Sequence, residues 1–366
     1  MNKQLSLLNG LAILCVVISH SAGYGQAALF HWSDQIRATA DPSYTAVGSL
    51  AYYALLTIRQ FVAFSVAAFV FTSGWFITYA AGAQATLSWK IVRARLITIL
   101  IPYLIWTFLF FIIDYARGVR PGFLDYVLKI LTGGGSYYFI PLICYLYLLS
   151  PFLVPWARKH GVALLIGAAV VQLATMSLLY LSLLPAKPPV IDALYNFIVN
   201  WSLPLWIFYY VFGLVAGFNV EACSKWIDRV KWLTLASIIP LGIGAVVESD
   251  LVFRATGRSW GYIPIYLPLS LLALAIIISF LAFRIQSRAV GQILRWLGAR
   301  SLGLYLTNSR AIGFSSSIVQ RYAPAIEGQQ LLYVPLQLLV GLGGPLLLMT
   351  IVSKSPARKY YRYLFG

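Results

Sequence analysis

Few side chains able to act in catalysis lie within the long apolar runs of this sequence, and each is costly to place in hydrocarbon. His20 ends one such run, which begins near Leu5. Imidazole is suited to take a proton at neutral pH, because its unperturbed pKa lies close to that pH. The alternative is a structural histidine that bonds a backbone carbonyl. We therefore expect His20 to be a general base or a buried structural residue.

The spacing around His20 predicts which way it faces. On a helical wheel, Asn9, Ile13, Val16 and His20 fall within about 60°, so one face of a helix carries both polar residues. At 1.5 Å per residue, His20 lies about 22 Å beyond Leu5, in the outer part of a membrane. We expect this face to point into the protein, with Asn9 as a candidate for binding substrate.

A basic cluster precedes another apolar run in the segment KIVRARLITILIPYL. Lys90, Arg93 and Arg95 suit a phosphate ligand, because each guanidinium offers a planar fork of donors. The alternative is a basic flank that only orients the helix in the membrane.

A third group lies on one predicted helix near the C-terminal end. Ser301, Tyr305 and Asn308 are spaced by four and three residues and share a face, with Arg310 roughly opposite. A lipid-facing arginine at that depth costs about 2.5 to 3.5 kcal/mol even on the gentlest scale. Arg310 is therefore expected either to pair with an Asp or Glu of an outer loop or to stabilise charge in a reaction.

Composition identifies the elements that position these residues. The chain has 366 residues, of which 60% are hydrophobic and 10% charged, and its mean hydropathy is +0.81. Such a composition excludes a soluble enzyme and a disordered chain. Hydropathy predicts an all-α polytopic integral membrane protein with about ten transmembrane helices in one domain, residues 1–366. The predicted ranges are 5–24, 60–81, 96–113, 137–156, 161–183, 200–218, 232–247, 262–283, 301–319 and 332–353.

An even number of helices places both termini on one side of the membrane, and the basic residues indicate the cytoplasmic side. Basic clusters at 90–95, 158–159, 225–231 and 354–362 would share it. This bias explains the net charge of +17 without a nucleic-acid partner. Connections are expected to be short except at 25–59 and 114–136.

Several segments, in order, resemble the membrane-bound acyltransferase 3 family. They include LSLLNGLAILCVVISH ending in His20, FVFTSGWFI around Ser73 and Gly74, RARLITILIPYLIW, and LGARSLGLYLTN. The resemblance covers nearly the whole chain and implies transfer of acyl groups, commonly acetyl, onto sugars and other acceptors.

The sequence departs from the family at two places. Ser6 and Asn9 stand where the first helix usually carries an Asp and then an Arg or Lys, and Asn308 stands where the family often has a histidine. We hypothesise that Arg310 compensates for the missing charge. A catalytically degenerate member that only binds a lipid or glycan is an alternative.

The resemblance also implies the site and its partners. Acyl-CoA, commonly acetyl-CoA, would be a cytoplasmic co-substrate, with no permanently bound cofactor and no metal. Its phosphates and arm would meet the group Arg93, Arg95, Lys90 and Ser73, and its thioester would approach His20. Oxyanion donors would come from the group Ser301, Tyr305, Asn308 and Arg310. The acceptor would be a cell-surface glycan or lipid-linked sugar, and the protein a multi-pass protein of the bacterial plasma membrane.

A secondary transporter is the alternative from another class, since it also has many helices and proline-interrupted segments, here at Pro141, Pro204 and Pro264. Against it, the sequence shows no inverted repeat and no mid-helix carboxylate for ion coupling. A charged outer cluster consists of Glu248, Asp250, Arg254 and Arg258. These residues either contact a sugar or belong to a solvated loop.

Overall fold

The computed structural model describes residues 2–37, 46–134, 137–201, 203–257, 266–283, 285 and 287–366. Across these residues the chain forms helices and no strand. The long helices are α1 (Asn2–Arg37), α3 (Phe64–Ala81), α4 (Trp89–Ala116), α6 (Phe139–Lys159), α7 (Gly161–Leu181), α9 (Leu203–Phe218), α10 (Val220–Thr256), α11 (Leu267–Ala282), α13 (Ser301–Tyr322) and α14 (Gln330–Lys354). Shorter helices are α2 (Leu50–Val62), α5 (Phe123–Thr132), α8 (Pro189–Trp201), α12 (Arg288–Gly298), α15 (Tyr361–Phe365), η1 (Pro324–Ile326) and η2 (Pro356–Tyr360).

The predicted all-α polytopic membrane fold is confirmed. Every predicted range overlaps a helix. Within the described residues, seven helical segments are long and apolar enough to cross a membrane, with α2 and α3 forming one of them. The bent pair of α8 and α9 makes an eighth. Of the remaining predicted spans, α11 is apolar but has only 16 residues, and α13 carries the polar group from Ser301 to Arg310.

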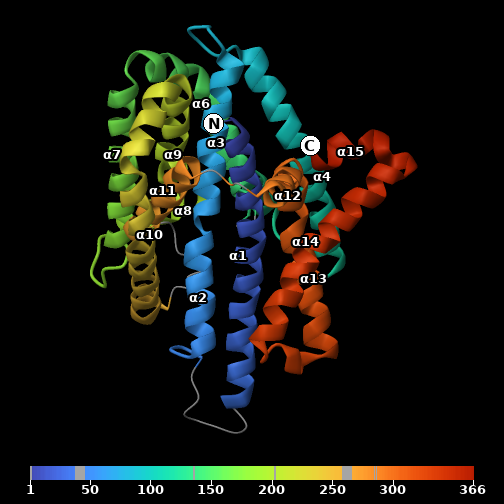
Figure 1. Ribbon diagram of the computed structural model, residues 1–366. Coiled ribbons are helices and arrows are strands. Elements are labelled where there is room, and N and C mark those ends of the chain that lie inside the picture. The colour runs from blue at the N-terminus through green and yellow to red at the C-terminus, as the bar shows by residue number, and fades with distance from the viewer. Residues whose placement is uncertain are drawn as a thin grey trace.

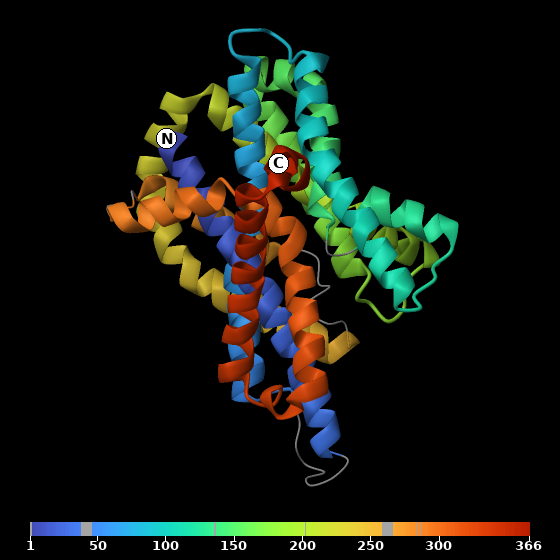
Figure 2. The same ribbon diagram turned by 90° about the vertical axis from the view of Figure 1, so that its right-hand side faces the viewer.

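Most of the helices run along one direction (Figure 1). The two ends of the chain lie toward the same end of the bundle, together with the turn between α3 and α4, as the even number of predicted spans requires (Figures 1 and 2). The C-terminal end of α1, the start of α2 and the turn from α13 to α14 lie at the opposite end. Basic clusters flank the first of these ends, which is the end that the sequence predicts to be cytoplasmic.

Two predicted long connections are partly helical, which corrects the prediction. The segment 25–59 is largely the continuation of α1 to Arg37 and the start of α2 at Leu50. The segment 114–136 contains α5. Hydropathy missed these parts because a helix can continue into the aqueous layer, where polar side chains interrupt the apolar signal.

Close backbone contacts hold α3 against α9 in the centre of the fold. A Cβ atom placed on Gly74 would lie 2.2 Å from the carbonyl oxygen of Tyr210, and one on Gly213 would lie 2.0 Å from that of Phe71. Only glycine allows such an approach, which is a common basis of helix packing in membranes. The FVFTSGWFI segment is therefore also a packing element.

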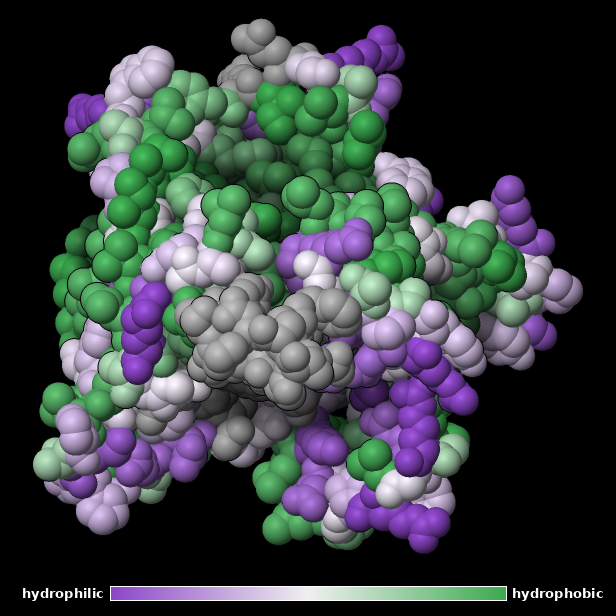
Figure 3. Space-filling view, turned by 90° about the horizontal axis from the view of Figure 1, so that it is seen from below, coloured by the Kyte–Doolittle hydropathy of each residue, from purple (hydrophilic) through white to green (hydrophobic). Residues whose placement is uncertain are grey.

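Figure 3 views the end opposite to the termini. Hydrophilic residues lie in several groups on this face, beside large hydrophobic areas. This pattern is expected where helices leave a hydrocarbon layer and enter water.

Candidate active site

The predicted inward face of α1 is present in the structure. Ile13 and Val16 are buried, at 0% and 4% exposure, in a cluster with Tyr137 and Tyr305. At the inner end of this face, the Thr72 hydroxyl of α3 donates to Oδ1 of Asn9 at 2.7 Å. Asn9 therefore joins the first helix to the segment that contains Ser73.

His20 lies half-buried on the same face of α1. The turns on either side of it pack against α13: Val17 meets Ile312 beside Gly341, and the Tyr24 hydroxyl lies on Gly313. Across the part of the chain that the structure describes, no group hydrogen-bonds the imidazole. The alternative of a structural histidine bonded to a backbone carbonyl therefore has no support among these residues.

Arg59 is a charged neighbour of His20. It lies in the last turn of α2, and its guanidinium reaches across to α1, where a Cβ atom on Gly23 would be 2.6 Å from one of its nitrogens. Arg59 falls in the predicted connection 25–59 and was not among the predicted site residues. The signal was available, since Arg59 interrupts the apolar run AYYALLTIRQFVAF.

The residues that the spacing predicts to share one face of α13 are buried or half-buried. Tyr305 is 7% exposed and Asn308 is fully buried, while Ser301 is half-buried at the helix start. The Tyr305 ring packs against Phe139 at 5.5 Å and Tyr137 at 6.2 Å between centroids. Tyr305 therefore connects α13 to the beginning of α6.

Asn308 leaves one polar atom available. Its Nδ2 donates to the carbonyls of Leu304 at 2.7 Å and Tyr305 at 3.0 Å. Its Oδ1 is buried and has no partner among the described residues. An unpaired buried acceptor costs about 1 to 3 kcal/mol, so this oxygen is suited to accept a hydrogen bond from a ligand or water.

Arg310 forms an ion pair with Asp114 at the end of α4. Two parallel bonds join the guanidinium to the carboxylate, each at 3.1 Å. The Phe110 ring lies 4.8 Å from the guanidinium carbon, and Tyr137 is a further polar neighbour. Of the two roles predicted for Arg310, pairing with an outer carboxylate is the one the contacts support. Arg310 is thus engaged by α4, whereas Arg59 lies beside His20.

This pair predicts a coupled loss of stability. We expect Arg310→Gln and Asp114→Asn each to lower the thermal midpoint in detergent, because each leaves one charge of the ion pair without its partner. Since Arg310 is exposed and Asp114 only half-buried, the cost of each change is about 1 kcal/mol or less. The double variant should cost less than the sum of the two. Thermal unfolding followed by size-exclusion chromatography measures this, and Arg321→Gln, an exposed residue on the same helix, is the control. Strict additivity would contradict the coupling.

The basic cluster at the inner end contains one residue bonded within the protein and two exposed residues. Arg95 donates to the carbonyl of Phe76 at 3.2 Å and lies 5.8 Å from the centroid of the Tyr147 ring. Lys90 and Arg93 are exposed. Arg95 is therefore held among α3, α4 and α6, while the other two remain available to a ligand at the surface.

A stripe on α3 connects this inner cluster with the Tyr305 group. Phe69, Ser73 and Phe76 are spaced by four and three residues and share a face. Arg95 binds at the Phe76 end, and the Phe69 ring contacts Phe139 at 5.6 Å at the other end. Ser73 is half-buried between them. Contacts along this stripe thus extend from the inner basic cluster to the Tyr305 group.

The outer charged cluster bonds within the protein. Asp250 accepts from Tyr52 at 2.7 Å and from Arg254 at 2.9 Å, and Glu248 accepts from Tyr180 at 2.5 Å. These bonds tie α10 to α2 and α7, which favours a structural role over sugar contact. Arg258 lies outside the described residues.

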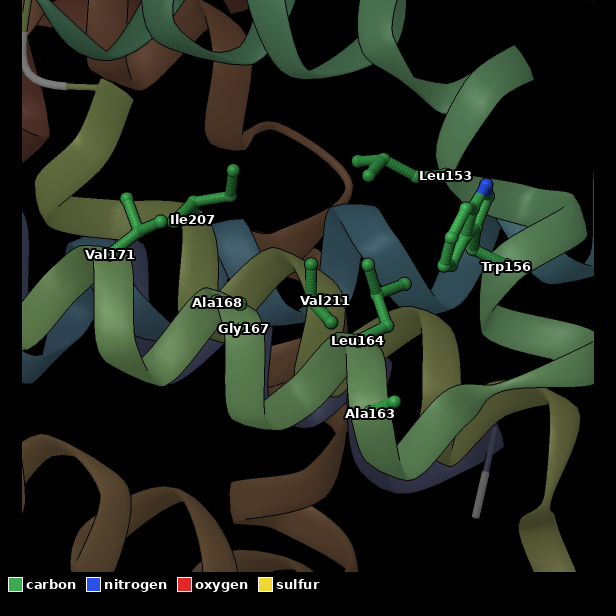
Figure 4. Close-up of a pocket in the computed structure, with 9 residues that line it drawn as sticks. All are labelled: Leu153, Trp156, Ala163, Leu164, Gly167, Ala168, Val171, Ile207 and Val211. Atoms are coloured by element: carbon green, nitrogen blue, oxygen red, sulfur yellow. The ribbon is translucent and has the colours of Figure 1, made fainter.

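A hollow of about 320 Å³ opens among α6, α7 and α9 (Figure 4). Its lining is apolar and includes Leu153, Trp156 and Val171. None of the predicted site residues lines it, and it offers no group able to take or donate a proton. The candidate active site therefore lies elsewhere, between the inward face of α1, the stripe of α3 and the polar group of α13.

The family of the chain follows from a match that covers nearly all of it. The model of an acyltransferase domain, Acyl_transf_3, matches residues 2–353. The chain belongs to the acyltransferase 3 family. No curated protein and no solved structure shows a significant match.

Membership establishes the general activity of this acyltransferase 3 protein. It is an integral membrane acyltransferase that acts on hydroxyl groups and therefore uses an acyl donor and an acceptor. The family match favours this enzyme class over the secondary transporter considered above. His20 is the histidine at the end of the first-helix segment that resembles the family, and Arg59 lies in its surroundings.

Proposed function

We propose that this protein transfers an acyl group, commonly acetyl, from cytoplasmic acyl-CoA to a hydroxyl of a cell-surface glycan or lipid-linked sugar. The observation that carries the proposal is His20, half-buried inside an acyltransferase bundle, without a hydrogen bond from the described residues and beside the cation of Arg59. A free imidazole in that position can act as a base toward a substrate hydroxyl.

The donor would enter from the inner end. Arg93 and Lys90, both exposed, would bind the CoA phosphates, and Arg95 would add its charge from the interface of α3 and α6. The pantetheine arm would follow the α3 stripe past Ser73. Asn9, bonded to Thr72 on the neighbouring face of α3, would meet the substrate further along this route, and Ser301 would do so at the start of α13.

The chemical step requires one base and an anion-stabilising environment. A nitrogen of His20 takes the proton of the acceptor hydroxyl. The hydroxyl oxygen of the acceptor bonds the thioester carbonyl carbon at the same time, giving a tetrahedral oxyanion. The carbon to sulfur bond then breaks, and the imidazolium returns the proton to the leaving thiolate, so the products are an ester and CoA thiol. Acylation of His20 itself, followed by transfer, is an alternative route within the same class.

The oxyanion would be stabilised by groups around His20. Arg59 supplies the nearby positive charge, and Tyr305 and Asn308 line the α13 side. A good preorganised donor contributes about 3 to 4 kcal/mol in known cases. Arg59, in place of Arg310, would therefore compensate for the charged residue that the chain lacks at Asn9.

The experiment that tests the function is transfer of radiolabelled acetyl from acetyl-CoA, in membranes that contain the native lipids and glycans. Label in an ester product supports the proposal. Wild-type membranes that incorporate no label beyond membranes without the protein would contradict it and support the degenerate binding protein.

The donor site makes its own prediction. We expect Arg93→Ala, alone and with Arg95→Ala, to raise KM for acetyl-CoA about tenfold or more, because each lost charged hydrogen bond to phosphate costs about 1.5 to 3 kcal/mol. The single variant is needed because Arg95 also contacts α3. The control is Arg358→Ala/Lys359→Ala, an exposed basic pair. An unchanged KM in both variants would place the CoA phosphates elsewhere.

A further inference from the structure

Helix α12 crosses α1 instead of running beside it (Figure 2). The contact is backbone to backbone. A Cβ atom on Gly10 would lie 1.8 Å from the carbonyl oxygen of Leu294, and one on Gly298 would lie 2.8 Å from that of Ser6. Because glycine at these positions permits the approach, α12 rests directly on the inner part of the helix that carries Asn9 and His20.

The circumference of α12 is divided into three sectors. Leu294 and Leu297 are buried, each at 6% exposure, in the sector that includes the contact with α1. A second sector is apolar but exposed, with Val290 at 45%, Ile293 at 57% and Trp296 at 44%.

The third sector of α12 is polar and carries both of its charged residues. It consists of Arg288, Gln292 and Arg295, which are all exposed and fall within about 60° at 100° per residue. The exposed apolar sector lies on another side of the helix. An apolar sector next to a basic one is the signature of a helix that lies in the plane of a membrane interface.

The depth of α12 agrees with that location. Its contact at Gly10 is seven residues beyond Lys3, which is about 10 Å along α1. Lys3 is exposed near the start of the first span. Interfacial helices bury their apolar side about 5 to 10 Å into the boundary between headgroups and acyl chains, so α12 lies at the expected level.

We propose that α12 is an interfacial helix that binds anionic lipid headgroups on the inner side of the membrane. Arg288 and Arg295 contact the lipid phosphates, while Val290, Ile293 and Trp296 lie among the acyl chains. Charge complementarity selects anionic lipids, and the apolar sector requires a lipid surface. Acyl-CoA phosphates would engage the arginines but would leave three large apolar side chains in water.

The first test measures lipid retention by native mass spectrometry in micelles with equal amounts of anionic phosphatidylglycerol and neutral phosphatidylcholine of the same chains. The wild type should retain phosphatidylglycerol preferentially. Arg288→Gln/Arg295→Gln should lower that preference by on the order of tenfold, because each basic residue contributes about 1 kcal/mol near an anionic surface. The matched control is Arg117→Gln/Arg120→Gln, an exposed pair at the opposite end. Equal preference in all three proteins would overturn the proposal.

The second test locates α12 in a bilayer without relying on activity. Spin labels at Ile293→Cys and Gln292→Cys, in proteoliposomes containing phosphatidylglycerol, report access to oxygen in lipid and to a water-soluble nickel chelate. The label at 293 should favour oxygen and the label at 292 the nickel chelate. If both labels were reached by the nickel chelate and not by oxygen in lipid, the interfacial location would be overturned. If added CoA displaced phosphatidylglycerol, the arginines would belong to the acyl donor site instead.

Discussion

Replacing His20 by alanine is expected to lower acetyl transfer about a hundredfold or more, since a positioned general base contributes about 10² to 10⁴. The loss should appear in kcat, because the imidazole acts on the reacting hydroxyl and the donor is bound elsewhere. His20→Asn, which keeps a polar side chain without a comparable base, should lose as much. Labelled ester formation in membranes matched for expression measures both variants.

The control for this prediction is His160→Ala, because His160 is exposed at the end of α6. It should transfer acetyl as the wild type does. If His20→Ala retained full activity, the assignment of the base would be wrong, although the protein would remain an acyltransferase. If His20→Ala lost activity through misfolding, its thermal midpoint would fall well below that of the wild type.

The second large effect is expected at Arg59. We expect Arg59→Gln to lower kcat about a hundredfold, with a smaller change in KM, because a positive charge beside the reacting atoms acts mainly on the transition state in a medium of low dielectric constant. Arg59→Lys should recover part of the activity, since it keeps the charge but not the fork of donors. If Arg59→Gln and Arg59→Lys lost activity equally, and the loss followed a fall in thermal midpoint, the result would instead indicate a packing role.

A glycine provides an independent test of Arg59 without removing its charge. Gly23→Ala places a Cβ atom 2.6 Å from the guanidinium, so the side chain must move away from its present position beside α1. We expect a fall in kcat in the same direction as Arg59→Gln. Gly343→Ala is the matched control, because a Cβ atom there meets no other atom within 4 Å. Full activity of Gly23→Ala would contradict the role of Arg59.

Patterns within one helix could be predicted well from the sequence. The inward face of α1 and the buried stripe of α13 follow from side-chain spacing, and burial of Val16 and Asn308 confirms both. The helix ranges follow from hydropathy, because the backbone of each apolar run must form its own hydrogen bonds in lipid. Helix ends were less accurate, as in α1, which continues to Arg37.

Contacts between distant helices could not be predicted in the same way. Asp114 was not identified as the partner of Arg310, although an acidic partner was expected, because nothing in either helix specifies which others surround it. Arg59, within the predicted connection 25–59, was not identified as a neighbour of His20 for the same reason. A long side chain can reach a neighbouring helix, and hydropathy records only where its backbone lies.

The sequence by itself determined that this chain is a helical membrane protein, that it belongs to the acyltransferase 3 family and that His20 faces inward with Asn9. Local spacing and hydropathy are sufficient for these conclusions, because lipid imposes them on each helix separately. Only the tertiary structure decided that Arg59 lies beside His20, that Asp114 holds Arg310 and that α12 crosses α1 at Gly10. These depend on how helices pack, and packing is set by the combined shape of many side chains rather than by the pattern of any one helix.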